Sequence, residues 1–398
     1  MHNRRFVKVA GVVCGLALVA AACGDDSSDT TDTTGGGSDG GGEVTEISLA
    51  WVGPLTGDAA NLGVLIRDGA KVAVEQFNDA NPEFKVTLEE FDTQGDPAQA
   101  PTVLDDYIDD ESIIGVVGPA FSGETKAVLP TLTEEGLVMV SASATNTELP
   151  EVVPGGSSFH RVLPDDAAQA AGIAKYLNTE VQPATIAIVH DNTEYGKGLA
   201  EDQLVPLLDG IEIVAQEVVD PESDDFSSAV NAVNSSGAEV IFYGGYYEEA
   251  GQLRKQLVDA GSEAVFISGD GSLDPGFIEA AGDAADGSLL TCPCSFATTE
   301  AEGALGEFAT AYEEINDSSP GTYSAEGFDA ANILLTGILE GNTDRASLLE
   351  YVEGLKEFPD AISKVVTFAE NGNIEAQGIF IFEIVDGVIT QKLATDDL

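Results

Sequence analysis

The chain after Glu46 alternates short runs of β-branched residues with longer stretches of helical periodicity. Each short run is a strand candidate, and each longer stretch carries apolar residues at helical spacing. A chain with this alternation folds into parallel sheets that are covered by helices on both faces. The first set comprises strands 47–53, 85–92, 113–118 and 137–141 and helices 59–79, 97–108 and 124–135.

A second set with the same pattern begins near Asp166. We predict helices 166–178, 195–208, 226–235 and 248–260 and strands 184–190, 211–219, 239–243 and 264–268. The later elements lack alternating partners, so we expect them to pack back onto the two earlier units: helices 301–315, 325–340 and 344–354 and strands 364–369 and 378–393. The predicted fold class is therefore α/β, with two doubly wound, Rossmann-like domains.

The chain begins with the features of a secreted lipoprotein. Basic residues precede the apolar run 9–22, which is too short to span a bilayer, so we predict a signal peptide over residues 1–22. The junction Ala20-Ala-Ala-Cys23 resembles a lipobox, although Leu is more usual than Ala20, and an ordinary cleavage site is the alternative. Residues 24–43 contain only Gly, Ser, Thr, Asp and Glu, which predicts a flexible tether. We expect an extracytoplasmic protein that is anchored to the cell membrane through lipid on Cys23.

Charge and motif content argue against nucleic-acid binding and against the common catalytic motifs. With 70 acidic against 16 basic side chains and a net charge of -54, nucleic acid is an implausible partner. The sequence contains no GxSxG, HExxH or GxxxxGK[ST] motif, and only His160 and His190 remain after the predicted leader. We predict no catalytic residues, no metal and no cofactor.

Cys292 and Cys294 flank Pro293 and are the thiols that remain after the leader and Cys23. A disulfide is the default outside the cytoplasm, although the Cα atoms of an extended i, i+2 pair lie about 6.6 to 7.2 Å apart, near or beyond the bridging limit. A redox-active pair is the alternative, but CxC lacks the CxxC spacing of thioredoxin-like motifs. Two thiols do not make a zinc site.

Ligands of doubly wound sheets bind beyond the carboxyl ends of the strands. Three strands of the first set end in small turns with hydroxyl groups, at 53–57, 118–123 and 141–145. Free N–H groups at a helix N-terminus, together with Ser and Thr hydroxyls, suit an anionic group such as a carboxylate. Each hydroxyl taken singly is explained as a helix N-cap, but three such turns at one edge favour an anion site.

The second set ends its strands in phenols and a carboxylate. Tyr195 and Tyr246 follow two of the strands, and Asp270 stands between glycines after a third. Asp270 is suited to hold an ammonium by charge-assisted hydrogen bonds, although glycine neighbours are also ordinary for a turn aspartate. A carboxylate site on one unit and an ammonium site on the other fit a zwitterion.

With these turns in place, the chain resembles the branched-chain amino acid (Leu/Ile/Val) binding proteins of ABC transporters, which have the type I periplasmic binding fold. The resemblance runs from about Ile47 to Ile389. Its most specific stretches are IAIVHD at 186–191 with YGKGLA at 195–200, and YGGY at 243–246 with GQ at 251–252. Gly118-Pro119 with Ser122, Ala144-Thr145 and Gly372 support it.

The resemblance implies roles for individual residues. Ser122 and Thr145 are expected to bind the ligand carboxylate, helped by the backbone of Ser143 and Ala144. Asp270 is expected to take the ammonium, although the family often has the longer Glu there. Leu62 replaces a pocket aromatic of the family, and Ala120 and Phe121 also differ from its best-known members. We expect the remaining side chains to close the cleft or shape its side-chain end: Tyr195, Tyr246, Leu62, Phe121 and Tyr323.

The resemblance also implies three chain crossings, near 164–166, 290–293 and 373–376. They divide the chain into one lobe of residues 44–165 plus 293–375 and a second lobe of residues 166–292 plus 376–398. We expect a monomer that closes around a small amino acid and delivers it to the permease subunits of a transporter. The alternatives are an amide, urea or aromatic acid as ligand, a sensor for a signalling receptor, and an enzyme that uses Cys292 and Cys294.

Overall fold

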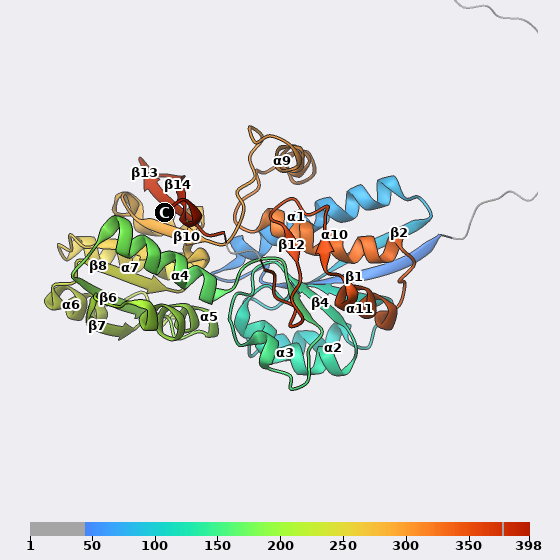
Figure 1. Ribbon diagram of the computed structural model, residues 1–398, viewed down its shortest axis with the longest axis horizontal. Coiled ribbons are helices and arrows are strands. Elements are labelled where there is room, and N and C mark those ends of the chain that lie inside the picture. The colour runs from blue at the N-terminus through green and yellow to red at the C-terminus, as the bar shows by residue number, and fades with distance from the viewer. Residues whose placement is uncertain (1–43, 376–377) are drawn as a thin grey trace, which may run out of the picture. The chain divides into compact units, whose positions relative to one another are not determined.

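The computed structural model describes residues 44–375 and 378–398 (Figure 1). The predicted signal peptide 1–22, Cys23 and the tether up to residue 43 lie outside the described residues. Within the described ranges, no helix combines the length and the apolar character needed to cross a membrane.

The first sheet is parallel throughout and has the strand order β2-β1-β3-β4-β5. Successive residues of β1 point to opposite faces, so Leu49 and Trp51 enter a different cluster of buried side chains from Ala50 and Val52. Both faces are therefore apolar and need a covering layer of helices. The strands are β1 Thr45–Gly53, β2 Phe84–Asp92, β3 Ile113–Val117, β4 Val138–Ser141 and β5 Phe159–Arg161.

Helices cover both faces of this sheet (Figure 1). Buried side chains of α1 (Ala60–Ala80), α9 (Ala304–Asn316), α10 (Ser324–Leu339) and α11 (Arg345–Gly354) belong to the cluster that contains Trp51. Those of α2 (Ala100–Tyr107) and α3 (Ser122–Glu134) join the cluster that contains Val52. The late helices α9 to α11 thus complete a layer that α1 begins, as expected for elements without partners of their own.

The second sheet has the order β14-β13-β10-β9-β8-β6-β7. Strands β6 to β10 pair with one another in parallel, whereas β13 is antiparallel to both β10 and β14. The strands are β6 Thr185–His190, β7 Glu212–Val218, β8 Val240–Gly244, β9 Val265–Ser268, β10 Leu289–Cys292, β13 Phe380–Val385 and β14 Val388–Ala394.

Two helical layers enclose the second sheet. Ile186 and Ile188 of β6 pack with α4 (Asp166–Tyr176) and the π-helical segment Gly198–Leu204, whereas Ala187 and Val189 face α6 (Ser227–Ser236), α7 (Tyr247–Asp259) and α8 (Pro275–Ala281). We call each sheet with its helices a lobe, the first lobe built on β1 to β5 and the second on β6 to β10, β13 and β14. The predicted α/β class is confirmed.

Several predicted elements differ from the structure. Strands β5 and β10, of three and four residues, and helix α8, of seven, were not predicted; elements this short show little of a period. The run 378–393 is a hairpin whose two-residue turn, Asp386-Gly387, has positive φ at both positions. The predicted strand 364–369 shrinks to β12 (Val366–Thr367), which pairs with β11 (Glu357–Phe358) outside both large sheets.

The predicted helix 195–208 also changes character along its length. It consists of a short α5 (Glu194–Lys197), the π-helical segment Gly198–Leu204 and a 3-10 turn, Val205–Leu207. Proline at position 206 lacks an N–H, so a regular α-helix cannot continue past the preceding turn without losing a hydrogen bond.

The chain passes from the first lobe to the second between β5 and α4, returns between β10 and α9, and passes back between β12 and β13. Cys292 ends β10 at the second passage and forms a disulfide with Cys294. Their Cα atoms are 5.1 Å apart, closer than an extended backbone allows, so the segment bends at Pro293. Residues 376–377 of the third passage lie outside the described residues, and the exact lobe boundaries stay predictions.

Candidate functional site

One pocket lies where the carboxyl ends of strands from both sheets meet. Strands β3 and β4 contribute from the first lobe and β6, β8 and β9 from the second, which is the edge where doubly wound sheets bind ligands. Eight of the predicted ligand-binding residues line this pocket. The full lining is Leu62, Phe121, Ser122, Ser143, Tyr195, Tyr246, Asp270, Gly271 and Tyr323.

The pocket is narrow because aromatic rings meet inside it. The Tyr246 ring lies 4.7 Å from the Phe121 ring and 5.3 Å from the Tyr195 ring, measured between centroids. The free space between the lining side chains is about 10 Å³, roughly the room that one water molecule needs. Any larger ligand therefore requires these rings to separate.

Asp270 supplies the negative charge of the pocket. It follows β9 and is 3% exposed, and its carboxylate accepts a hydrogen bond from the Tyr195 hydroxyl at Oδ1 (2.9 Å) and from the Tyr323 hydroxyl at Oδ2 (2.6 Å). Burial raises the pKa of Asp270, and the two hydroxyl bonds oppose that rise. Each carboxylate oxygen has a second lone pair, so the group can still accept hydrogen bonds from an ammonium.

Tyr323 reaches Asp270 from the opposite lobe. It immediately precedes α10, and its φ of 66° lies in the left-handed region that aromatic residues rarely adopt. The ring is buried, and its hydroxyl bond to Asp270 spans 53 residues of sequence. This contact joins the two lobes directly at the floor of the pocket.

Ser122 and Thr145 supply hydroxyl groups on the first-lobe side. Ser122 is the first residue of α3, and its Oγ accepts the backbone N–H of Asn146 (3.1 Å), which leaves the hydroxyl proton free to donate. The Thr145 hydroxyl is buried without a hydrogen-bond partner among the described residues. Two hydroxyl donors near the N-terminus of a helix are chemically suited to an anion.

Ser143 and Ala144 are bonded within their own loop. The Ser143 hydroxyl donates to the carbonyl of Ala120 (2.6 Å), and the backbone N–H groups of Ser143 and Ala144 point to Oγ of Ser141 (3.4 and 3.1 Å). Ala144 and Thr145 are buried beside the pocket without forming part of its lining. In this structure the backbone N–H groups of Ser143 and Ala144 therefore form hydrogen bonds within the loop.

Leu62 of α1, Phe121 and Tyr246 form the apolar end of the pocket. All three side chains are largely buried, and Phe121 directly precedes α3. An apolar wall of this kind suits an aliphatic or aromatic group, while the polar groups determine how a ligand is oriented.

Gly271 was not predicted as part of the pocket. A Cβ atom at this position would lie 2.6 Å from the Tyr195 ring, so only glycine lets that ring cross the end of β9. Its N–H donates to the Tyr195 hydroxyl (2.9 Å), which in turn donates to Asp270. The sequence Gly269-Asp270-Gly271 is the local pattern from which this close approach of the Tyr195 ring could have been predicted.

Asp166 was predicted only as the start of a helix. It is fully buried at the first turn of α4, and neither carboxylate oxygen has a hydrogen-bond partner among the described residues. Burial raises its pKa well above the ordinary value and the nearby Asp270 raises it further, whereas the neighbouring Thr145 hydroxyl and the charge of Arg161 lower it. Its N–H donates to the carbonyl of Thr145 (2.9 Å), which places the start of α4 against the hydroxyl side of the pocket. Nothing in its local sequence distinguishes it from an exposed helix-start aspartate.

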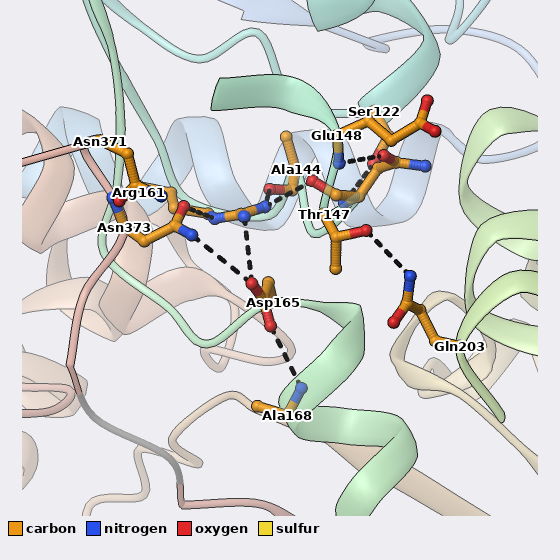
Figure 2. A network of polar contacts seen from close by, with 11 residues as sticks. Ser122, Ala144, Thr147, Glu148, Arg161, Asp165, Ala168, Gln203, Asn371 and Asn373 are labelled. Carbon is orange, nitrogen blue, oxygen red and sulfur yellow. Dashed lines mark hydrogen bonds and ion pairs between the residues drawn. The ribbon is translucent and has the colours of Figure 1, made fainter. Parts of the chain in front are cut away.

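Polar contacts join the lobes on both sides of the pocket. Beside Ser122, the Asn146 side chain donates to the carbonyl of Glu194 (2.7 Å), and Gln203 donates to the Thr147 hydroxyl (3.0 Å; Figure 2). On the other side, the Asn61 side chain donates to Asp274 (3.2 Å). The structure is therefore that of two lobes closed upon one another.

The remaining cysteines and His160 are buried in the described ranges 44–375 and 378–398. No group of three or more His, Cys, Asp or Glu side chains there could hold a metal ion. Cys292 and Cys294 are bonded to each other and completely buried, so neither sulfur is available as a nucleophile. Burial also lowers the pKa of His160 to about 4, which keeps it neutral near pH 7.

Sequence comparison matches residues 46–388 to a family described as periplasmic binding protein. A Leu/Ile/Val-binding protein of Rhizobium johnstonii is 31% identical over 349 residues, which is 86% of this chain and 93% of that protein. A leucine-, isoleucine-, valine-, threonine- and alanine-binding protein of Pseudomonas aeruginosa is 30% identical over 296 residues, covering 73% and 78% of the two chains.

Solved structures share the fold. A leucine-binding protein from Thermotoga maritima superimposes with a TM-score of 0.79 at 24% identity, covering 88% of this chain and 100% of that one. A branched-chain amino acid transporter substrate-binding protein from Streptococcus pneumoniae, in complex with isoleucine, also gives 0.79, at 23% identity and with 88% and 99% covered. At these identities the likeness supports the architecture alone.

Proposed function

Because the chain belongs to the periplasmic binding protein family, we propose that it is an extracytoplasmic solute-binding protein of an ABC transporter that captures a small aliphatic amino acid. The proposal assigns the ligand carboxylate to Ser122 and Thr145 and the ammonium to Asp270. Leu62, Phe121 and Tyr246 would surround the ligand side chain. Members of this family are substrate-binding proteins, so we propose no catalytic step.

The proposal rests on one observation: one side of the pocket is suited to a negatively charged group of the ligand, and the other side to a positively charged group. The Ser122 hydroxyl lines the first-lobe side of the pocket at the N-terminus of α3, with the Thr145 hydroxyl buried beside the pocket, and a buried carboxylate lines the second-lobe side. An amino acid zwitterion is complementary to both ends. The relatives named above bind leucine, isoleucine and valine, which agrees with an apolar wall of moderate size.

Lobe closure supplies the physical mechanism. A ligand that contacts both lobes favours the closed form by the difference between its affinities for the closed and open forms. Periplasmic binding proteins close around their ligands by a hinge motion of two domains. Since the aromatic rings nearly fill the pocket, we propose that ligand entry requires the lobes to open and the Tyr246 ring to move aside.

Isothermal titration calorimetry of the full chain tests the proposal. We expect L-leucine, L-isoleucine, L-valine or L-alanine to bind, whereas 3-methylbutylamine and 4-methylpentanoic acid, which each lack one charged group of leucine, bind at least ~100-fold more weakly. Binding by none of the amino acids would contradict the proposal. Equal binding by the acid without an amine would support an amide, urea or aromatic acid as ligand.

We further propose that Cys23 carries a lipid and becomes the first residue of the mature chain, with residues 24–43 as the tether. The apolar run before Cys23 and the tether composition after it support this. The protein would then deliver its ligand to permease subunits as a monomer at the cell membrane. In a cell fractionation, Cys23→Ser should move the protein from the membrane fraction to the soluble one. An unchanged distribution would refute the anchor.

The interlobe ion pair of Lys126 predicts a salt-dependent contribution to affinity. Lys126 of α3 lies 2.8 Å from Glu194 of the second lobe and 3.3 Å from Glu148 of its own lobe. Both partners are partly exposed, so the pair is worth at most about 1 kcal/mol. We expect Lys126→Met to weaken amino acid binding up to ~5-fold in calorimetry at low salt, and less at 0.5 M NaCl.

The matched control is Lys85→Met, which removes an exposed pair with Glu46 inside the first lobe (2.9 Å). This pair does not cross the pocket, so affinity should stay unchanged at both salt concentrations. An equal loss in both variants would show that general charge, rather than the contact between lobes, is responsible.

A further inference from the structure

Arg161 is the last residue of β5 and is completely buried, which is unusual for a guanidinium in a chain with few basic residues. Its side chain donates in three directions (Figure 2). Nη1 donates to the carbonyls of Ala144 (3.0 Å) and Asn146 (2.9 Å), and Nε donates to Oδ1 of Asn373 (2.9 Å). Nη2 lies 3.5 Å from the Asp165 carboxylate.

The two carbonyls belong to the loop 144–147 beside the pocket. This loop carries the Thr145 hydroxyl, and its Asn146 N–H donates to Ser122 Oγ. Its other contacts reach the second lobe, through Asn146 to Glu194 and through Thr147 to Gln203. Arg161 therefore fixes the direction of the backbone that carries the Thr145 hydroxyl and that contacts the Ser122 hydroxyl.

The other partners of Arg161 lie where the chain passes between the lobes. Asp165 precedes α4 at the first passage, and its Oδ1 accepts the N–H of Ala168, so it caps that helix. Asn373 lies at the start of the third passage, and its side chain also contacts Asp165 (3.5 Å). The backbone N–H of Arg161 donates to the carbonyl of Gly372 (3.0 Å).

Gly372 shows how closely these two segments approach. A Cβ atom there would lie 2.0 Å from the carbonyl oxygen of Phe159, so the third passage runs directly against β5. A planar guanidinium with five N–H donors can bond three such segments at once, which a lysine ammonium on a flexible stem cannot do in the same geometry.

We propose that Arg161 is a positioning residue for ligand binding: it ties the loop 144–147 to two of the passages between the lobes, so that lobe closure and the placement of the Ser122 and Thr145 hydroxyls occur together. This inference rests on the proposed function, because it assigns a role in capturing the ligand carboxylate. Arg161 is not expected to touch the ligand. It acts by raising the fraction of molecules whose loop is already in the binding arrangement, and apparent affinity rises with that fraction.

A purely structural role for Arg161 is the competing explanation, and Arg345 provides the comparison. Arg345 of α11 also donates to main-chain carbonyls, those of Ile113 (2.9 Å), Ile108 (2.9 Å) and Asp110 (2.8 Å). These carbonyls flank the start of β3, at the opposite end of that strand from the pocket. Arg345→Met thus removes a similar set of bonds without reaching the loop 144–147.

The experiment titrates L-leucine and the other amino acids named above into the wild-type chain, Arg161→Met, Arg161→Lys, Asn373→Ala and Arg345→Met. We expect both Arg161 variants to bind about 10- to 30-fold more weakly and Asn373→Ala a few-fold more weakly, because residues that act through coupling change affinity by such amounts. Arg345→Met should bind within twofold of wild type. Melting temperatures measured in parallel separate affinity from stability. Asn373→Ala keeps the buried charge and serves if the Arg161 variants do not fold.

Two results of the titrations would overturn the inference: affinities of the Arg161 and Asn373 variants that all lie within threefold of wild type, or an equal loss of affinity in the Arg345 variant. Hydrogen–deuterium exchange without ligand gives a further test, in which we expect Arg161→Met and Asn373→Ala to lose protection at both 144–147 and 165–168. Loss of protection at one segment alone would contradict the coupling. If the wild type binds no amino acid, the proposed function fails, and the exchange measurement still decides the coupling.

Discussion

Replacing Asp270 by Asn is expected to weaken amino acid binding by about 100-fold or more while leaving the fold intact. Removing one member of a buried, hydrogen-bonded charge pair costs about 2 to 5 kcal/mol of binding free energy. Asn has almost the same shape as Asp and can still accept from one of the hydroxyls of Tyr195 and Tyr323 and donate to the other. The free protein also loses a buried charge whose pKa is already raised by burial. Its melting temperature should therefore stay equal or rise.

The control is Asp329→Asn, which changes an equally buried carboxylate away from the pocket. Asp329 accepts the backbone N–H groups of Ile362 (2.8 Å) and Ser363 (2.9 Å), and burial raises its pKa to about 6. An Asn there must turn an NH₂ group toward one of these donors, so the fold loses stability and affinity stays the same. Calorimetry and thermal melting of both variants measure the contrast.

Retained amino acid affinity in Asp270→Asn would show that the ammonium is bound elsewhere. The buried carboxylate of Asp166, beside Thr145, would then be the next group to test. A parallel loss of affinity and melting temperature in Asp270→Asn would mean that the carboxylate serves the fold. In either case the assignment of Asp270 to the ligand would have to be abandoned.

The stability of this protein is expected to fall as the pH rises from about 4 to 8, the reverse of ordinary acid denaturation. Burial raises the pKa of several carboxyl groups, to about 8 for Glu124, about 7 for Glu249 and about 6 for Asp191. The folded state therefore keeps protons that the unfolded state has already released, and stability decreases with pH wherever the folded state binds more protons. Growing negative net charge acts in the same direction.

Glu124 makes a contribution to this pH dependence that one substitution can test. It is completely buried in α3, accepts the N–H of Phe121 (2.8 Å) and the hydroxyl of Thr93, and lies near the charges of Asp92 and Asp96. The rise of the Glu124 pKa from 4.5 to about 8 corresponds to at most about 5 kcal/mol of unfolding free energy. This contribution is present below pH 4.5 and is lost as the pH rises through about 8.

Glu124→Gln removes the ionisable group, so the stability of this variant should decrease less than that of wild type as the pH rises. We expect the melting temperature of the variant to be no higher than that of wild type at pH 5 and to exceed it by several degrees at pH 8 to 9. Glu46→Gln is the control, because Glu46 is exposed and Lys85 lowers its pKa, so it does not titrate between pH 5 and 8. Parallel melting curves for wild type and Glu124→Gln across this range would refute the assignment.

The sequence alone determined the α/β class, because the spacing of apolar residues within each segment distinguishes the alternating strands and helices. The buried faces of β1 and β6 follow from the same pattern, since neighbouring residues of a strand point to opposite sides. The short strands β5 and β10 were missed, since three or four residues show little of a period. The resemblance to a known family placed the later helices, which local pattern left without partners.

Most of the candidate pocket was also predictable, because its residues follow strands whose carboxyl ends meet at one edge. Ser122, Tyr195, Tyr246 and Asp270 occupy that edge in the structure. Their assignment to particular parts of a ligand stays a prediction. The disulfide between Cys292 and Cys294 depends on a local bend at Pro293, which sequence spacing does not define and the folded backbone does.

Only the tertiary structure decided how the two lobes meet. The hydroxyl of Tyr323 reaches Asp270 across 53 residues of sequence, and Arg161 reaches Asn373 across 212. Such pairs leave no local pattern, because each residue taken alone has an ordinary neighbourhood, and the burial of Asp166 is hidden for the same reason. Periodicity specifies what a segment becomes, whereas packing of distant segments specifies which polar groups lose water and must find one another.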